Sequence, residues 1–196
     1  MFFSLAVVVY QKTIEKFEKL KEVSLYEKLA LVDFNTGVSS KTAWFYLVEK
    51  FNYLEHVGRI YCLIMFDMNN LKKLNDTLGH LVGDKVINAF CECLRETFRD
   101  KGNIYRIGGD EFICLLEGLD EDEVRKLLNE FDQRVAAQKD TEHKFTAAYG
   151  WTMFKPRSKE DFVTAQQRAD SLMYDMKKKM KSRAALEAAG TEGTRL

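Results

Sequence analysis

The chain has 196 residues, 46% of them hydrophobic and 31% charged, which suffices for one globular domain with an apolar core and an appendage but is short for two domains. Its 30 basic and 30 acidic residues balance, so the overall charge favours neither a nucleic-acid partner nor a membrane surface, and any phosphate site must be local. The four cysteines lack the spacing of zinc or redox sites, and we interpret them as reduced thiols of a cytoplasmic protein.

The first residues, MFFSLAVVVY, are apolar but lack the basic start and the cleavage site of a signal peptide. They are also too few to cross a hydrocarbon core, which needs about 20 residues. Two interpretations stay open: the cytoplasmic end of a membrane-anchoring helix that begins outside this chain, which we favour slightly, and a helix start that packs on a partner. Residues 10–32 show imperfect heptads, which predict either a short coiled coil or a helix packed on its own domain. We assign residues 1–32 to this apolar stretch and a signalling helix.

The rest of the chain alternates between helical and strand periodicity. In chain order we expect a turn cluster at 33–40, a helix at 41–53, a buried strand at 59–66, a short helix and loop at 69–78, a helix at 81–98, a hairpin of strands 103–107 and 111–116, a helix at 120–135, a strand at 145–154 and a helix at 159–181. This order predicts an α+β fold of the ferredoxin-like kind, in which helices flank a central, mainly antiparallel sheet. We expect one domain over residues 33–183 and a flexible C-terminal tail over residues 184–196.

The stretch RIGGDEFICLL interrupts its strand pattern with two glycines and two adjacent carboxylates. Gly108 and Gly109 indicate a hairpin turn, because glycine accepts a positive φ without steric cost. Asp110 and Glu111 would repel each other at this turn unless a cation or a donor-rich ligand neutralises them. The sequence therefore predicts a binding function for the turn rather than chain reversal alone.

A third carboxylate, Asp67, follows the predicted buried strand. Alone it would be interpreted as a helix N-cap, but if its strand pairs with the hairpin, three acids share one edge of the sheet. Oxygen ligands without histidine or thiolate suit a hard cation, Mg²⁺ or Mn²⁺, which takes further ligands from substrate phosphates. The intervening stretch MNNLKKLNDTLGHLVGD adds lysines for phosphate and paired donors and acceptors that could read a purine.

Three stretches, FDMNNLKKLNDTLGHLVGD, YRIGGDEF and RADSLMYDMKKKMKSR, together resemble the successive motifs of the GGDEF family, the diguanylate cyclases, over about residues 25–183. The resemblance implies the palm fold of nucleotidyl cyclases and the condensation of two GTP molecules into cyclic di-GMP with release of two pyrophosphates. In that family each domain holds one GTP and two domains face each other, so a homodimer is implied. Two Mg²⁺ or Mn²⁺ ions per site are implied as cofactors.

Carried over by motif position, the resemblance also implies roles for single residues. The metal ligands would be Asp67, the carbonyl of Met68, Asp110 and Glu111. The catalytic residues would be Asp110 as base for the attacking hydroxyl, Lys72, which neutralises phosphate charge, and Glu111. The substrate-binding residues would be Asn75, His80, Asp84, Gly108, Gly109, Lys177 and Lys181. Of these, Asp84 would accept from guanine N1–H and the 2-amino group, and Lys177 would clamp the terminal phosphates.

Some positions depart from the family pattern. Asn69 stands where a second Asp is frequent, which we expect to matter little, and Asn35 in DFNTG stands where a Leu is usual, which forfeits an apolar contact. Lys181 replaces an Arg, so bidentate phosphate binding is lost. In the motif of the product-inhibition site, Arg99 is present but Gly102 replaces the Asp, which predicts weak or absent product feedback.

Three functions stay open. The leading one is a diguanylate cyclase, a nucleotidyltransferase that forms phosphorus–oxygen bonds. The second is a non-catalytic GTP-binding or dimerisation module in signalling, mildly favoured by the altered basic motif at 177–182. The third is a nucleotidyltransferase that uses ATP, against which Asp84 argues. Expected partners are GTP, a second copy of the chain and a membrane or sensor segment N-terminal to it, with no nucleic acid.

Overall fold

The computed structural model describes residues 29–51, 53–98, 100–138 and 144–192, and before them residues 10, 12–14, 16, 18, 19 and 21. Residues 1–9 of the predicted apolar stretch MFFSLAVVVY, and with them the membrane-anchor interpretation, lie outside the described residues. About half of the predicted signalling helix, residues 10–32, lies outside them as well. Of its described side chains, Ile14 and Leu29 are exposed. None of the described helices combines the length and the apolarity that a membrane span requires.

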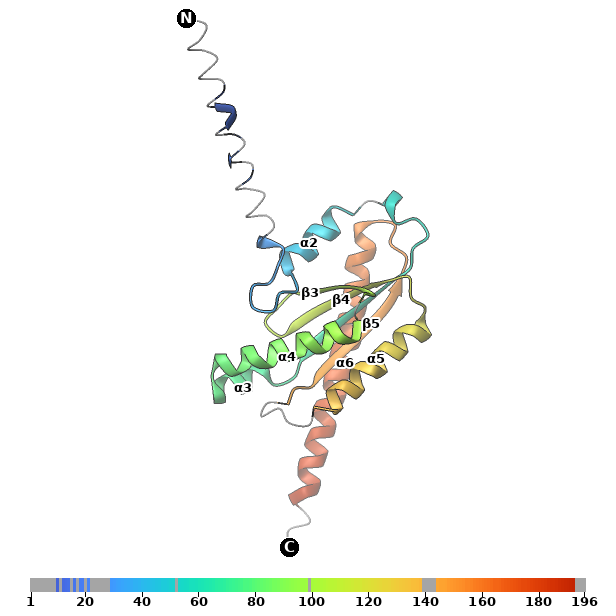
Figure 1. Cartoon of the computed structure of the whole chain (residues 1–196). Helices are drawn as coiled ribbons and strands as arrows, with labels where there is room; N and C mark the ends of the chain where they lie inside the picture. Colours follow the sequence, from blue (N-terminus) through green and yellow to red (C-terminus); the bar gives the residue numbers. More distant parts are fainter. Residues whose placement is uncertain are drawn as a thin grey trace, which may run out of the picture.

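Among the described residues, five strands form one sheet in the order β1-β3-β4-β2-β5 (Figure 1). Their bounds are Ser39–Ser40 (β1), Tyr61–Met68 (β2), Gly102–Arg106 (β3), Glu111–Glu117 (β4) and Ala147–Phe154 (β5). β2 pairs antiparallel with β4 and β5, and β3 pairs antiparallel with β4. The predicted ferredoxin-like α+β fold is confirmed. The short β1, which adds a parallel edge to β3, was not predicted because two residues carry no periodicity.

Helices cover both faces of the sheet (Figure 1). Their bounds are Lys41–Glu49 (α2), Leu71–Leu78 (α3), His80–Phe98 (α4), Glu121–Ala136 (α5) and Lys159–Glu192 (α6), with a 3₁₀ turn at Tyr53–Glu55. α4 and α5 pack on one face, and α2 and α6 pack on the other. β2 is buried along its whole length, so its alternate side chains enter the two cores. Leu63 and Met65 enter the core under α6, and Asp67 continues that row.

Two helices differ in length from the prediction. α2 ends at Glu49 instead of continuing to residue 53. α6 continues to Glu192, so residues 184–192 are helical. Their small polar composition had predicted a tail, but the run AALEAA within them consists of strong helix formers. The flexibility of residues 184–196 stays a prediction.

The start of α5 follows the predicted acidic signal. Asp120 accepts a hydrogen bond from the Glu123 N–H at 2.8 Å, and the Glu123 carboxylate accepts one from the Asp120 N–H at 2.9 Å. This capping box satisfies donors that the first helical turn leaves unpaired. It fixes the residue at which α5 begins, on the face of the sheet opposite α6.

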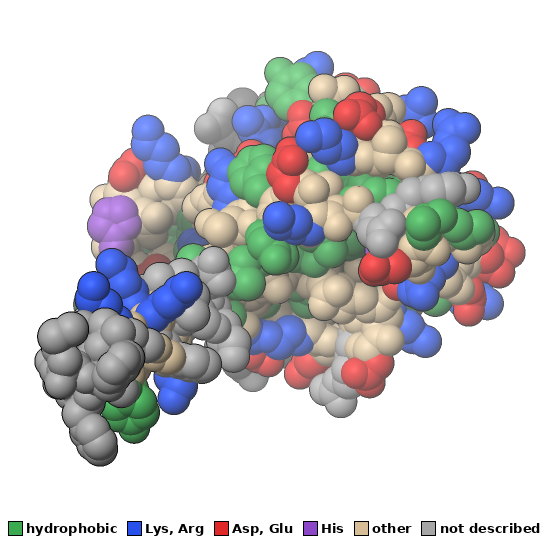
Figure 2. Space-filling view, turned by 90° about the horizontal axis from the view of Figure 1, so that it is seen from above, with side chains coloured by type: hydrophobic (Ala, Val, Ile, Leu, Met, Phe, Trp, Pro, Cys, Tyr) green, Lys and Arg blue, Asp and Glu red, His purple; other side chains and the backbone are tan. Residues whose placement is uncertain are grey.

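Charge is mixed over the surface. On the face seen in Figure 2, basic and acidic side chains alternate with hydrophobic ones between them. Two exposed aromatic side chains of α2, Phe45 and Tyr46, lie beneath the ammonium groups of Lys41 and Lys50. A phosphate site on this protein must therefore depend on a few basic side chains that lie close together.

Gly150 of β5 sets the distance between α6 and the sheet. A Cβ at this position would lie 2.2 Å from the Ala169 carbonyl oxygen and 2.3 Å from the Met173 nitrogen, both in the backbone of α6. We expect Gly150→Ala to lower the free energy of unfolding by about 1–3 kcal/mol, because α6 must move outward. Denaturant unfolding measures the loss, with Gly109→Ala, where a Cβ would meet nothing within 4 Å, as the matched control. Equal stability of the two variants would contradict this close packing.

Candidate active site

The predicted meeting of the carboxylates follows from strand register. Asp67 in β2 lies directly opposite Glu111 in β4, and the Met68 N–H donates to the Asp110 carbonyl oxygen at 2.9 Å. Because side chains alternate along a strand, Asp67 and Glu111 share the sheet face that α6 covers. The structure thus brings these four residues, all predicted metal ligands, to one end of the sheet.

Lys177 of α6 pairs with Asp67. Its Nζ lies 2.6 Å from both carboxylate oxygens, and the two side chains are 24% and 10% exposed. A carboxylate this deeply buried needs a compensating charge. The sequence pattern placed Lys177 at the phosphates and did not predict this pair, because the pairing depends on where α6 crosses the sheet.

Negative charge is concentrated around Glu111. Burial raises the pKa of its carboxyl, and nearby aspartates raise it further, whereas Lys177 lowers it. The aspartates that raise this pKa are Asp110, Asp67 and Asp170. Asp170 was not among the predicted site residues, and only the packing of α6 places it near Glu111.

The raised pKa of Glu111 predicts a pH dependence of stability in the absence of metal. Above its ordinary pKa of 4.5, the folded chain still holds a proton that the unfolded chain has released, so the stabilising contribution falls as the pH rises through the folded-state pKa. We expect Glu111→Gln to flatten this fall. Denaturant unfolding in EDTA between about pH 4 and pH 7 measures it, and parallel curves for the two proteins would show that Glu111 is not responsible.

The two turn glycines serve different purposes. Neither Gly108 nor Gly109 has a positive φ, so the prediction that this turn needs glycine for its φ is wrong. A Cβ on Gly108 would lie 2.6 Å from Glu111 Oε2, which means that the missing side chain makes room for the Glu111 carboxylate. Around Gly109 a Cβ would meet nothing within 4 Å, so the space beside it is open.

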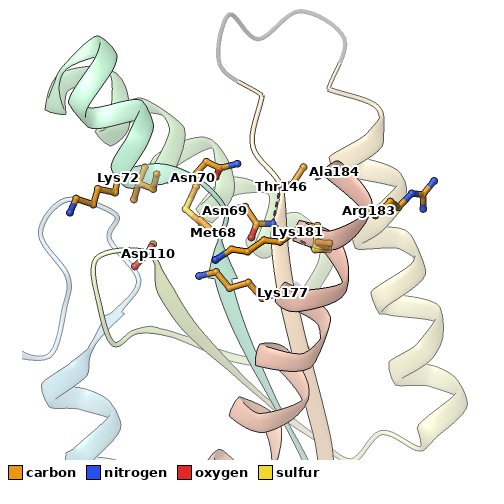
Figure 3. Close-up of a pocket in the computed structure, with 12 residues that line it drawn as sticks. Met68, Asn69, Asn70, Lys72, Asp110, Thr146, Lys177, Lys181, Arg183 and Ala184 are labelled. Atoms are coloured by element: carbon orange, nitrogen blue, oxygen red, sulfur yellow. Dashed lines mark hydrogen bonds between the residues drawn. The ribbon is translucent and has the colours of Figure 1, made fainter. Parts of the chain in front are cut away.

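A cavity of about 630 Å³ lies beside the carboxylates (Figure 3). Its lining includes Asp110 and Met68, with Lys177 and Lys181 from α6 and Lys72 from α3. Lys177 and Lys181 are one helical turn apart and extend from α6 side by side, while Lys72 lies on the opposite side (Figure 3). The volume is that of a small-molecule site, and three ammonium groups around it suit a polyphosphate.

The donor chemistry of the strand end fits a hard divalent cation. Asp67 already holds a positive charge, the Lys177 ammonium, between its two carboxylate oxygens. The described residues contain no group of three or more His, Cys, Asp or Glu side chains close enough to hold a metal by themselves. A cation held here would therefore need further ligands from water and substrate phosphates, as Mg²⁺ commonly takes.

The residues predicted to read guanine lie at the junction of α3 and α4. Asn75 packs so closely on Gly83 that a Cβ there would lie 1.8 Å from Asn75 Oδ1, and this oxygen is buried without a hydrogen-bond partner. Asp84, the residue after Gly83, is half-buried. His80 is exposed as the first residue of α4. None of these three residues belongs to the lining of the cavity.

Asn35 contacts Asp84, although the sequence predicted only the loss of an apolar contact. Its Nδ2 donates to Asp84 Oδ1 at 2.9 Å. Within the same turn, Asp33 Oδ1 accepts from the Thr36 N–H at 2.9 Å, the Thr36 hydroxyl at 2.6 Å and Arg106 Nη1 at 3.1 Å. Burial alone would raise the pKa of Asp33, but the hydrogen bonds from Thr36 and Arg106 outweigh it and lower that pKa.

Asn69 ties the end of β2 to the segment before β5. Its N–H donates to the Thr146 carbonyl oxygen at 2.8 Å and its Nδ2 to the Thr146 hydroxyl at 3.0 Å. Both Asn69 and Thr146 line the cavity (Figure 3). The residue thus contributes to packing and to the shape of the cavity wall.

The predicted product-inhibition motif is described only in part. Arg99 lies outside the described residues. At Gly102, a Cβ would lie 2.0 Å from the Leu115 carbonyl oxygen, so the backbone as folded leaves no space for the Asp that the family carries there. The weak product feedback stays a prediction.

Comparison with known proteins gives consistent matches. A family model described as "Diguanylate cyclase, GGDEF domain" matches residues 30–183. The chain is 31% identical over 154 residues to diguanylate cyclase DgcP of Pseudomonas aeruginosa, which covers 76% of this chain and 23% of that protein. It is 37% identical over 101 residues to diguanylate cyclase VdcA of Vibrio cholerae, which covers 51% of this chain and 29% of that protein.

Solved structures show the same fold. The coiled coil and GGDEF domain of DgcB from Caulobacter crescentus, in complex with c-di-GMP, is similar with a TM-score of 0.73 and 22% identity, covering 89% of this chain and 95% of that one. The chain spans less than a third of the length of DgcP or VdcA.

Proposed function

Because this chain belongs to the GGDEF family of diguanylate cyclases, we propose that it condenses two GTP molecules into cyclic di-GMP and releases two pyrophosphates. One observation carries the proposal. Asp67, Asp110 and Glu111 lie at the same end of the sheet, beside a cavity that Lys177 and Lys181 line from α6. Acidic groups for divalent cations therefore stand next to basic groups for phosphates.

The reaction balances as two equivalent displacements. The 3′-hydroxyl oxygen of one GTP attacks the α-phosphorus of the other, the bond from that phosphorus to the bridging oxygen breaks, and pyrophosphate leaves. Asp110, on the turn and half-buried, would accept the proton of the attacking hydroxyl. A repeat of the step with the roles exchanged closes the ring.

Divalent cations would be held by Asp67, the Met68 carbonyl, Asp110 and Glu111, with phosphate oxygens completing the shell. When bound, they would lower the pKa of the attacking hydroxyl and offset the charge that develops on the phosphate. Burial first, and then the neighbouring aspartates, raise the pKa of Glu111, and a bound cation would offset both the burial of its charge and this repulsion.

Lys177 would exchange partners when nucleotide and metal bind. Its ammonium neutralises Asp67 in the chain alone, and a divalent cation at Asp67 would release it toward the cavity that it already lines. There, with Lys181 one turn further along α6, it would bind the terminal phosphates, while Lys72 approaches from α3. The Lys177 ammonium is thereby paired with a negative group before and after binding, and the charge of the added cation is offset by the phosphates.

Two copies of the chain are required, because each domain would hold one GTP and the two nucleotides attack each other. The free and mostly buried cysteines agree with a reducing compartment, and GTP is an intracellular substrate. We therefore place the reaction in the cytoplasm, with a homodimer as the active species.

A non-catalytic GTP-binding or dimerisation module is the second candidate. One observation favours it. The Lys177 ammonium already neutralises Asp67, so a metal that binds Asp67 must displace Lys177 from a buried ion pair. If that displacement costs more than nucleotide binding supplies, GTP binds without turnover.

Incubation of the purified chain with GTP or ATP and Mg²⁺, followed by chromatographic separation of the products, tests the proposal. Cyclic di-GMP and pyrophosphate from GTP support it. Bound but unchanged GTP supports the non-catalytic module, and an adenine-containing product indicates a different nucleotidyltransferase.

A further inference from the structure

We propose that Asn35 positions Asp84 for guanine recognition and thereby strengthens the preference of this chain for guanine nucleotides. The inference rests on the proposed function, because it concerns the base of the GTP that the site would hold. It assigns a role to a position where the family pattern has an apolar residue.

The contact that supports this role joins two segments far apart in the sequence. Asn35 Nδ2 donates to Asp84 Oδ1 at 2.9 Å across 49 residues. Asn35 lies in an exposed turn, and Asp84 is half-buried in the first turns of α4. Without this donor, the Asp84 carboxylate would rotate about its terminal torsion, which is broad for Asp.

The contact leaves Asp84 able to read guanine. An ionised carboxylate offers about four acceptor positions, and Asn35 uses one of them on Oδ1. The positions that remain are enough for guanine N1–H and the 2-amino group. Because the donor orients the carboxylate plane beforehand, less side-chain freedom is lost on binding.

The turn that carries Asn35 is itself held in place. Asp33 accepts three hydrogen bonds, two from Thr36 and one from Arg106 of β3, and Arg95 of α4 donates to the Thr36 carbonyl oxygen. The Asp33 N–H also donates to the Val38 carbonyl oxygen at 2.8 Å. Asn35 is therefore presented to Asp84 from a fixed support rather than from a free loop.

The neighbouring Asn75 makes the same corner polar. Its Oδ1 is buried against Gly83 and lacks a partner among the described residues, as expected of a group that a ligand completes. Asn75, which lies against Gly83, and Asp84 with its bonded Asn35 thus supply polar groups near the α3–α4 junction for the donor-rich edge of guanine.

Calorimetry with α,β-methylene analogues of GTP and of inosine triphosphate, in Mg²⁺, tests the inference, because these analogues cannot release pyrophosphate and the inosine base lacks the 2-amino group. We expect Asn35→Leu to weaken binding of the GTP analogue about tenfold, the effect of one hydrogen bond to a charged group. The preference over the inosine analogue should fall about fivefold. Asn35→Gln, which keeps the amide donor, should recover part of both.

Two variants serve as controls. Thr36→Val removes the hydroxyl bond to Asp33 but keeps the Asn35–Asp84 pair and the other bonds of the turn, from the Thr36 N–H and from Arg106 to Asp33, so it should lower the preference much less than Asn35→Leu does. Asn129→Leu, on the exposed face of α5, accounts for a general effect of exchanging an exposed Asn for Leu. A fall in preference with Thr36→Val as large as with Asn35→Leu would reduce Asn35 to a turn residue and overturn the inference.

The remaining outcomes separate this inference from the proposed function. If the unchanged chain prefers the GTP analogue and Asn35→Leu does so equally, the role of Asn35 is refuted and the proposed function stands. If the unchanged chain binds neither analogue, the proposed function fails, and the inference fails with it.

Discussion

Asp110→Asn is expected to reduce formation of cyclic di-GMP by about 10²–10⁴-fold, the range that general base catalysis supplies. The substitution keeps the size of the side chain and the backbone bond in which the Asp110 carbonyl oxygen accepts from the Met68 N–H at 2.9 Å. It removes the negative charge and the basic oxygen that the attacking hydroxyl and a divalent cation both need. Product formation is measured by chromatography under saturating GTP and Mg²⁺.

The stability of this variant should change little or rise. Asp110 is half-buried on a turn, and its charge is one of those that raise the pKa of Glu111, so its loss relieves repulsion. Asp122→Asn, on the exposed first turn of α5, is the matched control and should retain full turnover. Undiminished product from Asp110→Asn would remove the residue from the chemistry and leave the proposed mechanism without its base.

The sequence predicted the parts of the site that follow from strand and turn chemistry. Asp67 faces Glu111 because a continuous apolar run pairs with a hairpin in one register, and a slip of that register by one residue would turn Asp67 and Glu111 toward opposite faces of the sheet. The fold class followed from the same alternation of elements. Local sequence pattern and the pairing of two strands are therefore sufficient to place these acidic residues at one end of the sheet.

The contacts that were missed all depend on how distant elements pack. Lys177 meets Asp67 because Gly150 lets α6 lie close to β5, and no local signal gives that crossing. Asn35 reaches Asp84 because the turn that carries it is hydrogen-bonded to both β3 and α4. The positive φ predicted for the turn glycines is wrong, and at Gly108 it is the Glu111 side chain that needs the space.

Lys177→Met is expected to lower the free energy of unfolding in EDTA by about 2–4 kcal/mol, somewhat below the usual cost of breaking a fully buried ion pair because Lys177 is 24% exposed. Methionine keeps the apolar stem, so the loss comes from leaving the Asp67 carboxylate buried without its cation. The double variant Asp67→Asn with Lys177→Met should recover most of the stability, because no charge is then left unpaired. Lys179→Met, exposed on the same helix, should lose little.

Stabilisation by a divalent metal distinguishes a purely structural Asp67–Lys177 ion pair from a cation site at Asp67. In Lys177→Met no ammonium competes at Asp67, so Mg²⁺ or Mn²⁺ should stabilise this variant more than the unchanged chain, in proportion to the tighter binding. Turnover should nevertheless fall, since the phosphates lose a positive charge that Lys181 alone does not replace. If Lys177→Met and Lys179→Met unfold alike in EDTA, Asp67 does not need Lys177. If metal stabilises both proteins equally, Asp67 does not accept a metal in place of Lys177, and the exchange of partners proposed for catalysis does not occur.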